Sequence, residues 1–212
     1  MMVSKKTDNV MNLNQIKKAV MGYEPEIILP DAPRFTAVLI PLVEIDGEIH
    51  VVFEIRGEGI AQAGEVSFPG GHVEKGETAE HAAIRETCEE LLVTEDQVEI
   101  LAPMHRMTDR GNLIVDSFLG VIYNYTGSFS KDEVSGIFTV PLDWLLEYEP
   151  EIHSAETVLH PENDFPFDLI PGGRDYQFIH FPKRFFFYHT QDAVIWGLTA
   201  ELLYHALHRL NQ

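Results

Sequence analysis

Three carboxylates stand close together in one short stretch of the chain, at Glu86, Glu89 and Glu90. On a helix, which turns by about 100° per residue, they fall within roughly a quarter of the circumference. Carboxylates this close repel one another, and a plain surface helix usually intersperses Lys or Arg. A divalent cation removes the conflict, because Mg²⁺ takes oxygen ligands and keeps several waters. The stretch is therefore a candidate metal site, and the alternative is the solvated face of an amphipathic helix.

The segment around these carboxylates contains features that begin a helix and place it on a core. Thr78 suits the N-cap, because its hydroxyl can accept a hydrogen bond from an N–H of the first turn. Ile84, Cys88 and Leu91 fall on the face opposite the carboxylates and are expected to pack on a core. We therefore interpret Cys88 as a packing residue rather than a nucleophile.

Two more charged residues and a glycine stand at fixed distances from the three carboxylates. The spacing G-x5-E-x7-R-E-x2-E-E resembles the signature of the Nudix hydrolases, matched by Gly71, Glu77, Arg85, Glu86, Glu89 and Glu90. Few unrelated sequences would meet all of these spacings at once. Thr87 departs from the signature where an aliphatic residue is usual, and Leu92 replaces the glycine that closes it. Both are interpreted as packing positions.

The resemblance implies a fold and a cofactor. The expected class is α/β, a Nudix-like α/β/α sandwich with a mixed β-sheet and a loop–helix–loop catalytic box at the end of the sheet. The likeness is strongest over residues 35–145. Mg²⁺ or Mn²⁺ would be the cofactor.

The resemblance also assigns roles to the residues that carry it. Glu86 and Glu90 would be the main metal ligands, with Glu89 binding directly or through water. The carbonyl of Gly71 would add an oxygen. The expected role of Glu77 is to pair with Arg85, so that the loop and the helix stay together.

The group that deprotonates the attacking water is left open, because the family supplies it from different places. Our candidate is Glu133, on a loop before a predicted strand. A solvated loop charge is an equally simple interpretation of this residue.

A second motif narrows the resemblance. Gly64 and Phe68-Pro69-Gly70-Gly71 resemble the motif of the coenzyme A pyrophosphatase branch, in which two arginines stand upstream. Arg56 matches the first and is our candidate for substrate contact. Ile60-Ala61-Gln62 stands where the second is usual. Because an arginine binds phosphate bidentately, this departure bears on recognition of the 3′-phosphate or of the diphosphate.

The expected function is that of a metal-dependent pyrophosphohydrolase. Its favoured substrate is coenzyme A or an acyl derivative, cut into 4′-phosphopantetheine and adenosine 3′,5′-bisphosphate. Another nucleoside diphosphate derivative, such as ADP-ribose, is the enzymatic alternative. A non-catalytic ligand sensor with the Nudix fold and a structural or interaction protein are the alternatives from other classes. A sensor would have no need of Glu86, Glu89 and Glu90.

Composition limits the partners. The net charge of −19 over 212 residues argues against a nucleic acid partner, because phosphate contacts need clustered Lys and Arg. A small nucleotide substrate is compatible with this charge, because local cations outweigh the global field.

A single cysteine and no apolar run long enough to span a membrane favour a cytoplasmic protein. A homodimer is one oligomeric state open to it.

Hydrophobic and turn patterns predict the remaining organisation. Asp46-Gly47 joins two β-branched runs, 35–45 and 48–56, and predicts a hairpin. Residues 147–174 show no clear period and are expected to be a long loop. Thr190 is expected to cap a helix over 190–210 that packs on the core. We therefore expect one domain, 1–212, with its core at 35–145.

Overall fold

The computed structural model describes residues 12–24, 27–29, 31–59, 61–109 and 111–212. Residues 1–31 and 32–212 form two units, described separately here. The first contains helix α1 (Leu13–Val20), whose N-cap Asn12 accepts a hydrogen bond from the Gln15 N–H. The organisation of 1–212 as a single domain stays a prediction.

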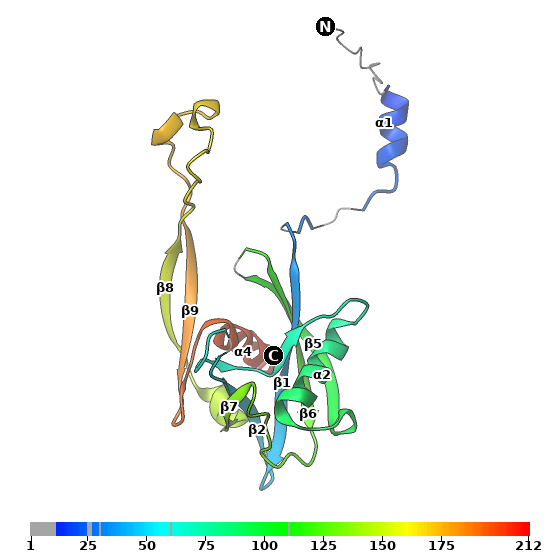
Figure 1. Cartoon of the computed structure of the whole chain (residues 1–212), viewed down its shortest axis with the longest axis vertical. Coiled ribbons are helices and arrows are strands. Elements are labelled where there is room, and N and C mark those ends of the chain that lie inside the picture. Colours follow the sequence, from blue (N-terminus) through cyan, green and yellow to red (C-terminus); the bar gives the residue numbers. More distant parts are fainter. Residues whose placement is uncertain (1–11, 25–26, 30, 60, 110) are drawn as a thin grey trace. The chain divides into compact units, whose positions relative to one another are not determined.

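The second unit contains the other regular elements (Figure 1). In chain order they are β1 (Arg34–Ile45), β2 (Glu48–Arg56), β3 (Val66–Ser67), β4 (Gly70–His72), α2 (Ala79–Leu91), β5 (Val98–Asp109), β6 (Leu113–Ile122), β7 (Val134–Pro141), α3 (Leu142–Glu147), β8 (Glu151–Thr157), β9 (Phe181–His189), β10 (Val194–Ile195) and α4 (Gly197–Leu210). None of the helices in the described residues is long and apolar enough to cross a membrane.

A mixed sheet of seven strands forms the centre of this unit. Its main order is β3-β2-β1-β6-β5, with β4 paired to β1 and β7 paired to β2. β1 and β6 run parallel, and the other pairs are antiparallel. The predicted hairpin is confirmed: Asp46 and Gly47 both adopt positive φ, at 52° and 86°, as a type I′ turn requires.

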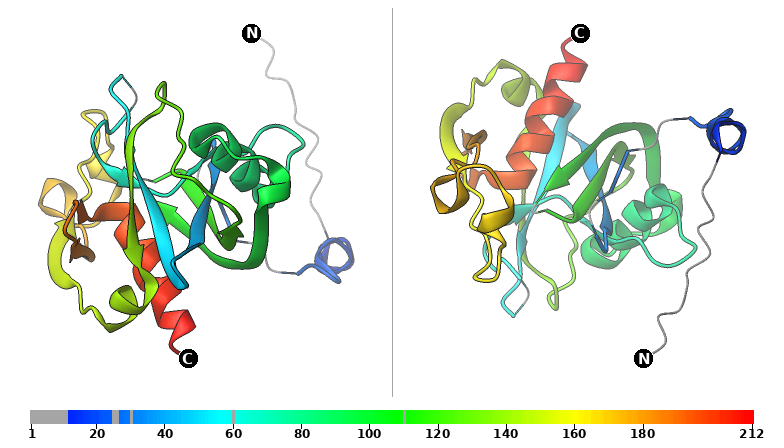
Figure 2. Two further views of the ribbon diagram at one scale, coloured as in Figure 1. Left: turned by 90° about the horizontal axis from the view of Figure 1, so that it is seen from below. Right: turned by 90° about the horizontal axis from the view of Figure 1, so that it is seen from above.

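Helices cover both faces of the sheet (Figure 2). On one face, Ile40 and Phe53 belong to a cluster that includes Leu202 and Leu203 of α4. On the other, Leu39 and Val52 belong to a second cluster that includes α2. Alternate residues of β1 and β2 thus pack on opposite sides, as the two-residue period of a strand dictates. The expected α/β sandwich with a mixed sheet is confirmed.

The face that α2 packs on the sheet differs from the expected one. Leu91 is fully buried and Cys88 packs half-buried against the second cluster, but Ile84 is only partly buried. Small side chains occupy the contact instead, since Ala83 and Thr87 are fully buried. The hydroxyl of Thr87 donates to the Ala83 carbonyl at 2.7 Å, which satisfies it inside the core.

The interpretation of Leu92 as a packing residue is wrong. It is the C-cap of α2 in the left-handed conformation, with φ 51° and ψ 45°, and 58% of it is exposed. This is the conformation in which a glycine commonly ends a helix. The backbone therefore keeps the geometry of the signature, although the residue differs.

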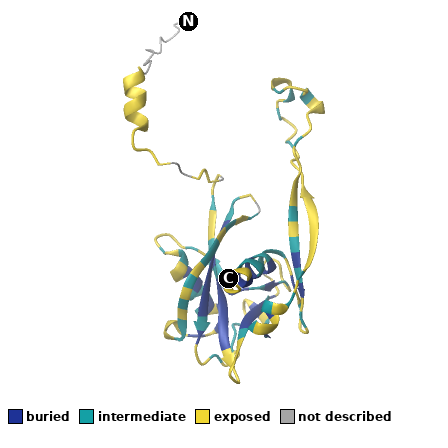
Figure 3. Cartoon of the chain, turned by 180° about the vertical axis from the view of Figure 1, so that it is seen from behind, coloured by how far each residue is buried: buried dark blue, intermediate teal, exposed yellow. Residues whose placement is uncertain are grey.

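Two expectations about the C-terminal half are corrected. The segment 147–174 is not one long loop, because β8 forms an exposed strand along β9, with His153 paired to Phe185 (Figure 3). The helix expected over 190–210 begins at Gly197. The Thr190 hydroxyl accepts from the N–H of Ala193 in a turn, and β10 then pairs with β9, so this backbone is extended.

Candidate active site

Residues 69–72, named the glycine loop here, include strand β4 and touch helix α2 directly. The N–H of Gly70 donates to Oε2 of Glu90 at 2.8 Å. A Cβ on Gly71 would lie 2.4 Å from the carboxylate carbon of Glu86, so only a glycine leaves room for this side chain. A Cβ on Gly70 would lie 2.3 Å from the carbonyl oxygen of Ala37 on β1. The loop thus lies between β1, with which β4 pairs, and α2.

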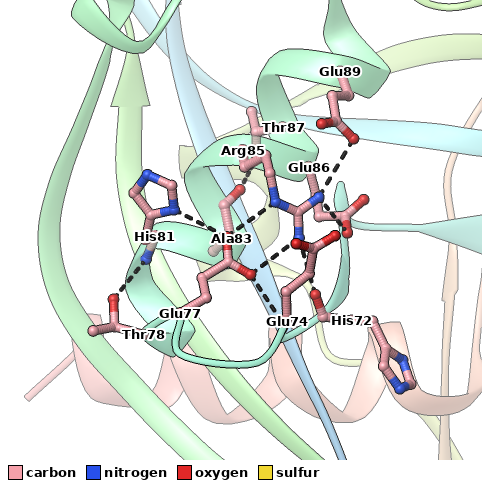
Figure 4. A network of polar contacts seen from close by, with 10 residues as sticks. All are labelled: His72, Glu74, Glu77, Thr78, His81, Ala83, Arg85, Glu86, Thr87 and Glu89. Atoms are coloured by element: carbon pink, nitrogen blue, oxygen red, sulfur yellow. Dashed lines mark hydrogen bonds and ion pairs between the residues drawn. The ribbon is translucent and has the colours of Figure 1, made fainter.

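Arg85 connects this loop to the helix (Figure 4). Its Nε donates to Glu77 Oε1 at 3.0 Å, and one terminal nitrogen donates to the His72 carbonyl at 3.0 Å. The other terminal nitrogen lies 2.9 Å from Glu86 Oε1. The hydrogen bonds of Glu77, first with Arg85 and then with the Glu74 N–H and His81, hold its pKa at about 2. The expected pair of Glu77 and Arg85 is present in this geometry.

The three carboxylates of α2 differ in environment. Glu90 is 7% exposed, and burial, reinforced by the charge of Glu54, raises its pKa to about 9. Burial also raises the pKa of Glu86. The side chain of Glu89 is largely exposed and lies 3.4 Å from Arg85. Glu86 and Glu90 therefore form the inner part of the cluster, and Glu89 lies at its solvent edge.

A fourth carboxylate, Glu54 on β2, was missed in the sequence. It is 1% exposed, and its Oε1 accepts from the Ser67 hydroxyl at 2.8 Å. Burial raises its pKa, and the charges of Glu86 and Glu133 add to the effect. The signal that would have found it is a lone acidic residue inside the apolar run Val51–Ile55.

Glu133 lies near the same group. The loop that carries it is attached to both neighbouring elements, because the Ser130 N–H donates to the Glu90 carbonyl and the Gly57 N–H donates to the Glu133 carbonyl. Its charge contributes to the raised pKa values of Glu86 and Glu90. The loop thus brings an exposed carboxylate toward the cluster.

A cavity of about 520 Å³ opens beside the glycine loop. Strand ends, β9 and the start of α4 all contribute to its wall, which includes Arg56, Gln62, Ser67, Phe68, Gly71, His72, Lys183, Phe185, Trp196 and Leu198. Arg56, the predicted substrate contact, donates from Nε to the Ala61 carbonyl at 2.9 Å. Lys183, which was not predicted, forms an ion pair with Asp109 at 2.6 Å. The cavity therefore combines two cations with aromatic surface.

The carboxylates of Glu54, Glu86 and Glu90 are suitable ligands for a hard divalent cation. Among the described residues, no three His, Cys, Asp or Glu side chains are already arranged around a metal position. Oε2 of Glu54 is buried and has no hydrogen-bond partner. The Glu86 carboxylate fills the space that a side chain at position 71 would take. All of these potential ligand atoms are oxygens, the atoms that Mg²⁺ and Mn²⁺ prefer.

Comparison with known proteins identifies the family. The NUDIX domain family matches residues 33–173. Nudix hydrolase 3 of Caenorhabditis elegans is 31% identical over 190 residues, 85% of this chain and 75% of the relative. The peroxisomal coenzyme A diphosphatase NUDT7 of Mus musculus is 30% identical over 132 residues, 61% of this chain and 55% of that protein.

A solved structure shows the same fold. The MutT/nudix family protein from Enterococcus faecalis superposes with a TM-score of 0.50 at 18% identity, covering 95% of this chain and 70% of that one. The chain belongs to the Nudix hydrolase family, enzymes that act on the diphosphate bonds of nucleoside derivatives.

Proposed function

We propose that this chain is a metal-dependent pyrophosphohydrolase of coenzyme A or an acyl derivative. The observation that carries the proposal is the direct contact of Gly70 and Gly71 with Glu90 and Glu86, at the edge of a cavity that Arg56 lines. Glu86 and Glu90 would hold Mg²⁺ or Mn²⁺, with Glu89 binding directly or through water. The carbonyl of Gly71 would supply a further oxygen.

The divalent cation would neutralise the diphosphate and lower the pKa of the attacking water. The protein groups supply position and charge, which is what phosphoryl transfer demands of an enzyme. Arg56 and Lys183 would bind phosphate oxygens from the cavity wall. The proposed base is Glu133, which would take the proton of the water as the bond from phosphorus to the bridging oxygen breaks. Arg85 and Glu77 act through the loop they hold.

The substrate assignment is supported by the motif and by one relative. Phe68 and Gly71, from the motif of the coenzyme A branch, both line the cavity, and the chain is 30% identical to a coenzyme A diphosphatase. Phe185 and Trp196 offer flat apolar surface in the same cavity, suited to an adenine ring. We place this reaction in the cytoplasm, because a chain with a single cysteine, Cys88, has no internal disulfide and fits a reducing compartment.

A substrate panel tests the proposal. Coenzyme A, dephospho-coenzyme A, acetyl-coenzyme A and ADP-ribose are incubated with enzyme and Mg²⁺ or Mn²⁺, and the products are separated by chromatography. We expect 4′-phosphopantetheine and adenosine 3′,5′-bisphosphate from coenzyme A. Cleavage of ADP-ribose without cleavage of coenzyme A would refute the substrate and keep the reaction class. Tight binding with no cleavage of any substrate would favour the sensor.

The missing second arginine of the motif can be tested in the same panel with the variant Gln62→Arg. Gln62 lies in the cavity wall with φ 62°, hydrogen-bonded to Glu65 at 2.6 Å. One charge-assisted contact is worth roughly 1.5–3 kcal/mol, so Gln62→Arg should lower KM for coenzyme A by about tenfold or more. The fall should be larger than for dephospho-coenzyme A, which lacks the 3′-phosphate. Equal effects on both would locate the contact at the diphosphate instead.

A further inference from the structure

Glu54 has a buried oxygen for which the protein supplies no partner. Its side chain is 1% exposed, and Ser67 donates to Oε1 only. Oε2 lies beyond the reach of solvent and of every hydrogen-bond donor among the described residues. Buried polar atoms are rarely left in this state, and each one calls for a cause, such as an ion.

The strand geometry shows where this side chain points. Successive side chains of β2 alternate between the two faces of the sheet. Phe53 and Ile55 pack with the cluster under α4, whereas Val52 packs with the cluster that α2 covers. Glu54 has the same parity as Val52, so it enters the sheet face that carries α2 and its carboxylates.

The surroundings of Glu54 on that face are acidic. Glu90, 7% exposed, is close enough for the two charges to repel, and Glu86 and Glu133 add to the same repulsion. Arg56 attracts Glu54, but its Nε is bonded to the Ala61 carbonyl. Arg85, the cation on α2, is bonded to Glu77, Glu86 and the loop. A bound cation is the group that this arrangement lacks.

We propose that Glu54 is a ligand of the divalent cation and binds it through Oε2, so that the metal site takes a carboxylate from β2 in addition to those of α2. Ser67 is the positioning residue, because its hydroxyl occupies Oε1 and leaves Oε2 free. The inference rests on the proposed metal site at Glu86 and Glu90, and it extends that site beyond the residues of the box signature.

Mn²⁺ binding tests the inference without any substrate. The full chain is titrated with Mn²⁺, and the concentration of free Mn²⁺ is measured by electron paramagnetic resonance. The parent is compared with Glu54→Gln. The substitution keeps the shape and removes the charge. Its Mn²⁺ dissociation constant should rise about ten- to hundredfold, the range typical of changes around a metal site. The matched control is Glu44→Gln, an exposed carboxylate on β1.

The rise in Tm on adding Mn²⁺ provides a second readout, which should be smaller for Glu54→Gln than for the parent. If Glu54→Gln does not fold, Glu54→Asp replaces it. This variant keeps the charge but is one methylene shorter, so it should also bind Mn²⁺ more weakly.

The outcomes distinguish a failure of Glu54 as a ligand from a failure of the proposed metal site at Glu86 and Glu90. Weaker Mn²⁺ binding by the Glu54 variant, with Glu44→Gln unchanged, supports Glu54 as a ligand. Parent-like affinity of the Glu54 variant would overturn the inference and leave the site at Glu86 and Glu90 intact. A parent protein that binds no Mn²⁺ would overturn the inference and the proposed function together.

Discussion

Replacing Gly71 by alanine would separate the geometry of the site from the stability of the fold. An ideal Cβ at this position lies 2.4 Å from both Cδ and Oε1 of Glu86, and 2.7 Å from Oε2. Ordinary contact between carbon atoms begins near 3.5 Å, so the carboxylate must retreat by about 1 Å. The carboxylate is the end of a flexible side chain, so the movement leaves the backbone in place and chiefly affects the hydrogen bond that Oε1 accepts from Arg85. A displacement of about 1 Å in a catalytic site can lower the rate on the order of a hundredfold.

The assay has three readouts on one set of proteins: turnover of the best substrate of the panel, the Mn²⁺ dissociation constant, and Tm. Gly71→Ala should lose about a hundredfold in turnover and bind Mn²⁺ more weakly, with Tm close to that of the parent. The control is Gly136→Ala on β7, where a Cβ would meet Ile55 at an ordinary 3.8 Å. It should behave like the parent in all three.

One result would refute this reasoning. If Gly71→Ala keeps turnover within about threefold of the parent, a difference of less than 1 kcal/mol in the barrier, Glu86 does not need its observed position. Its assignment as a main metal ligand would then be withdrawn.

Four further substitutions test other parts of the site. Glu90→Gln should lower turnover on the order of a hundredfold, and a folded variant with near-parent turnover would contradict the catalytic assignment. Arg85→Ala should lower both activity and Tm. The pKa of Glu77 is held at about 2, so the stability that the folded protein gains from the Glu77–Arg85 pair is present above about pH 4.5 and lost as the pH falls through 2. The difference in Tm between the parent and Arg85→Ala should therefore narrow in acid. An unchanged Tm with a raised KM would assign Arg85 to phosphate binding. Leu92→Gly should raise the free energy of unfolding in urea by about 1 kcal/mol, because it relieves a left-handed leucine; an unchanged or lower value would show no strain there. Gly70→Ala should lower that free energy by about 3 kcal/mol, since its Cβ meets the backbone of β1, and parent-like stability would contradict the close approach.

The parts predicted correctly from the sequence depend on short-range rules. Asp46-Gly47 fixes the hairpin because few residues tolerate two successive positive φ angles. Thr78 caps α2 by accepting from the His81 N–H at 3.1 Å. The pairing of Glu77 with Arg85 was implied by the resemblance to the Nudix signature and is seen in the hydrogen bonds. In each case the determining partners lie within eight residues of one another.

The parts that were missed depend on pairing between distant segments. β8 has no periodic apolar pattern and is exposed along its whole length, so only its register with β9 makes it a strand. The start of α4 is delayed because β10 pairs with β9 first. Lys183 reaches the cavity through that same β9, more than 100 residues after Gly71. Sequence patterns in one segment contain no information about such partners.

The two adjacent glycines connect these local and distant requirements. Gly70 approaches the backbone of Ala37 and Val38, and Gly71 approaches the side chain of Glu86, so the loop has no room for a side chain toward either neighbour. α2 consequently packs directly on β4, and β4 lies directly against the backbone of β1. The same contact brings the carboxylates of α2 to the sheet face that Glu54 enters from β2. The proposed metal site would therefore take ligands from both the sheet and the helix, and the box signature covers only the helix and the loop before it.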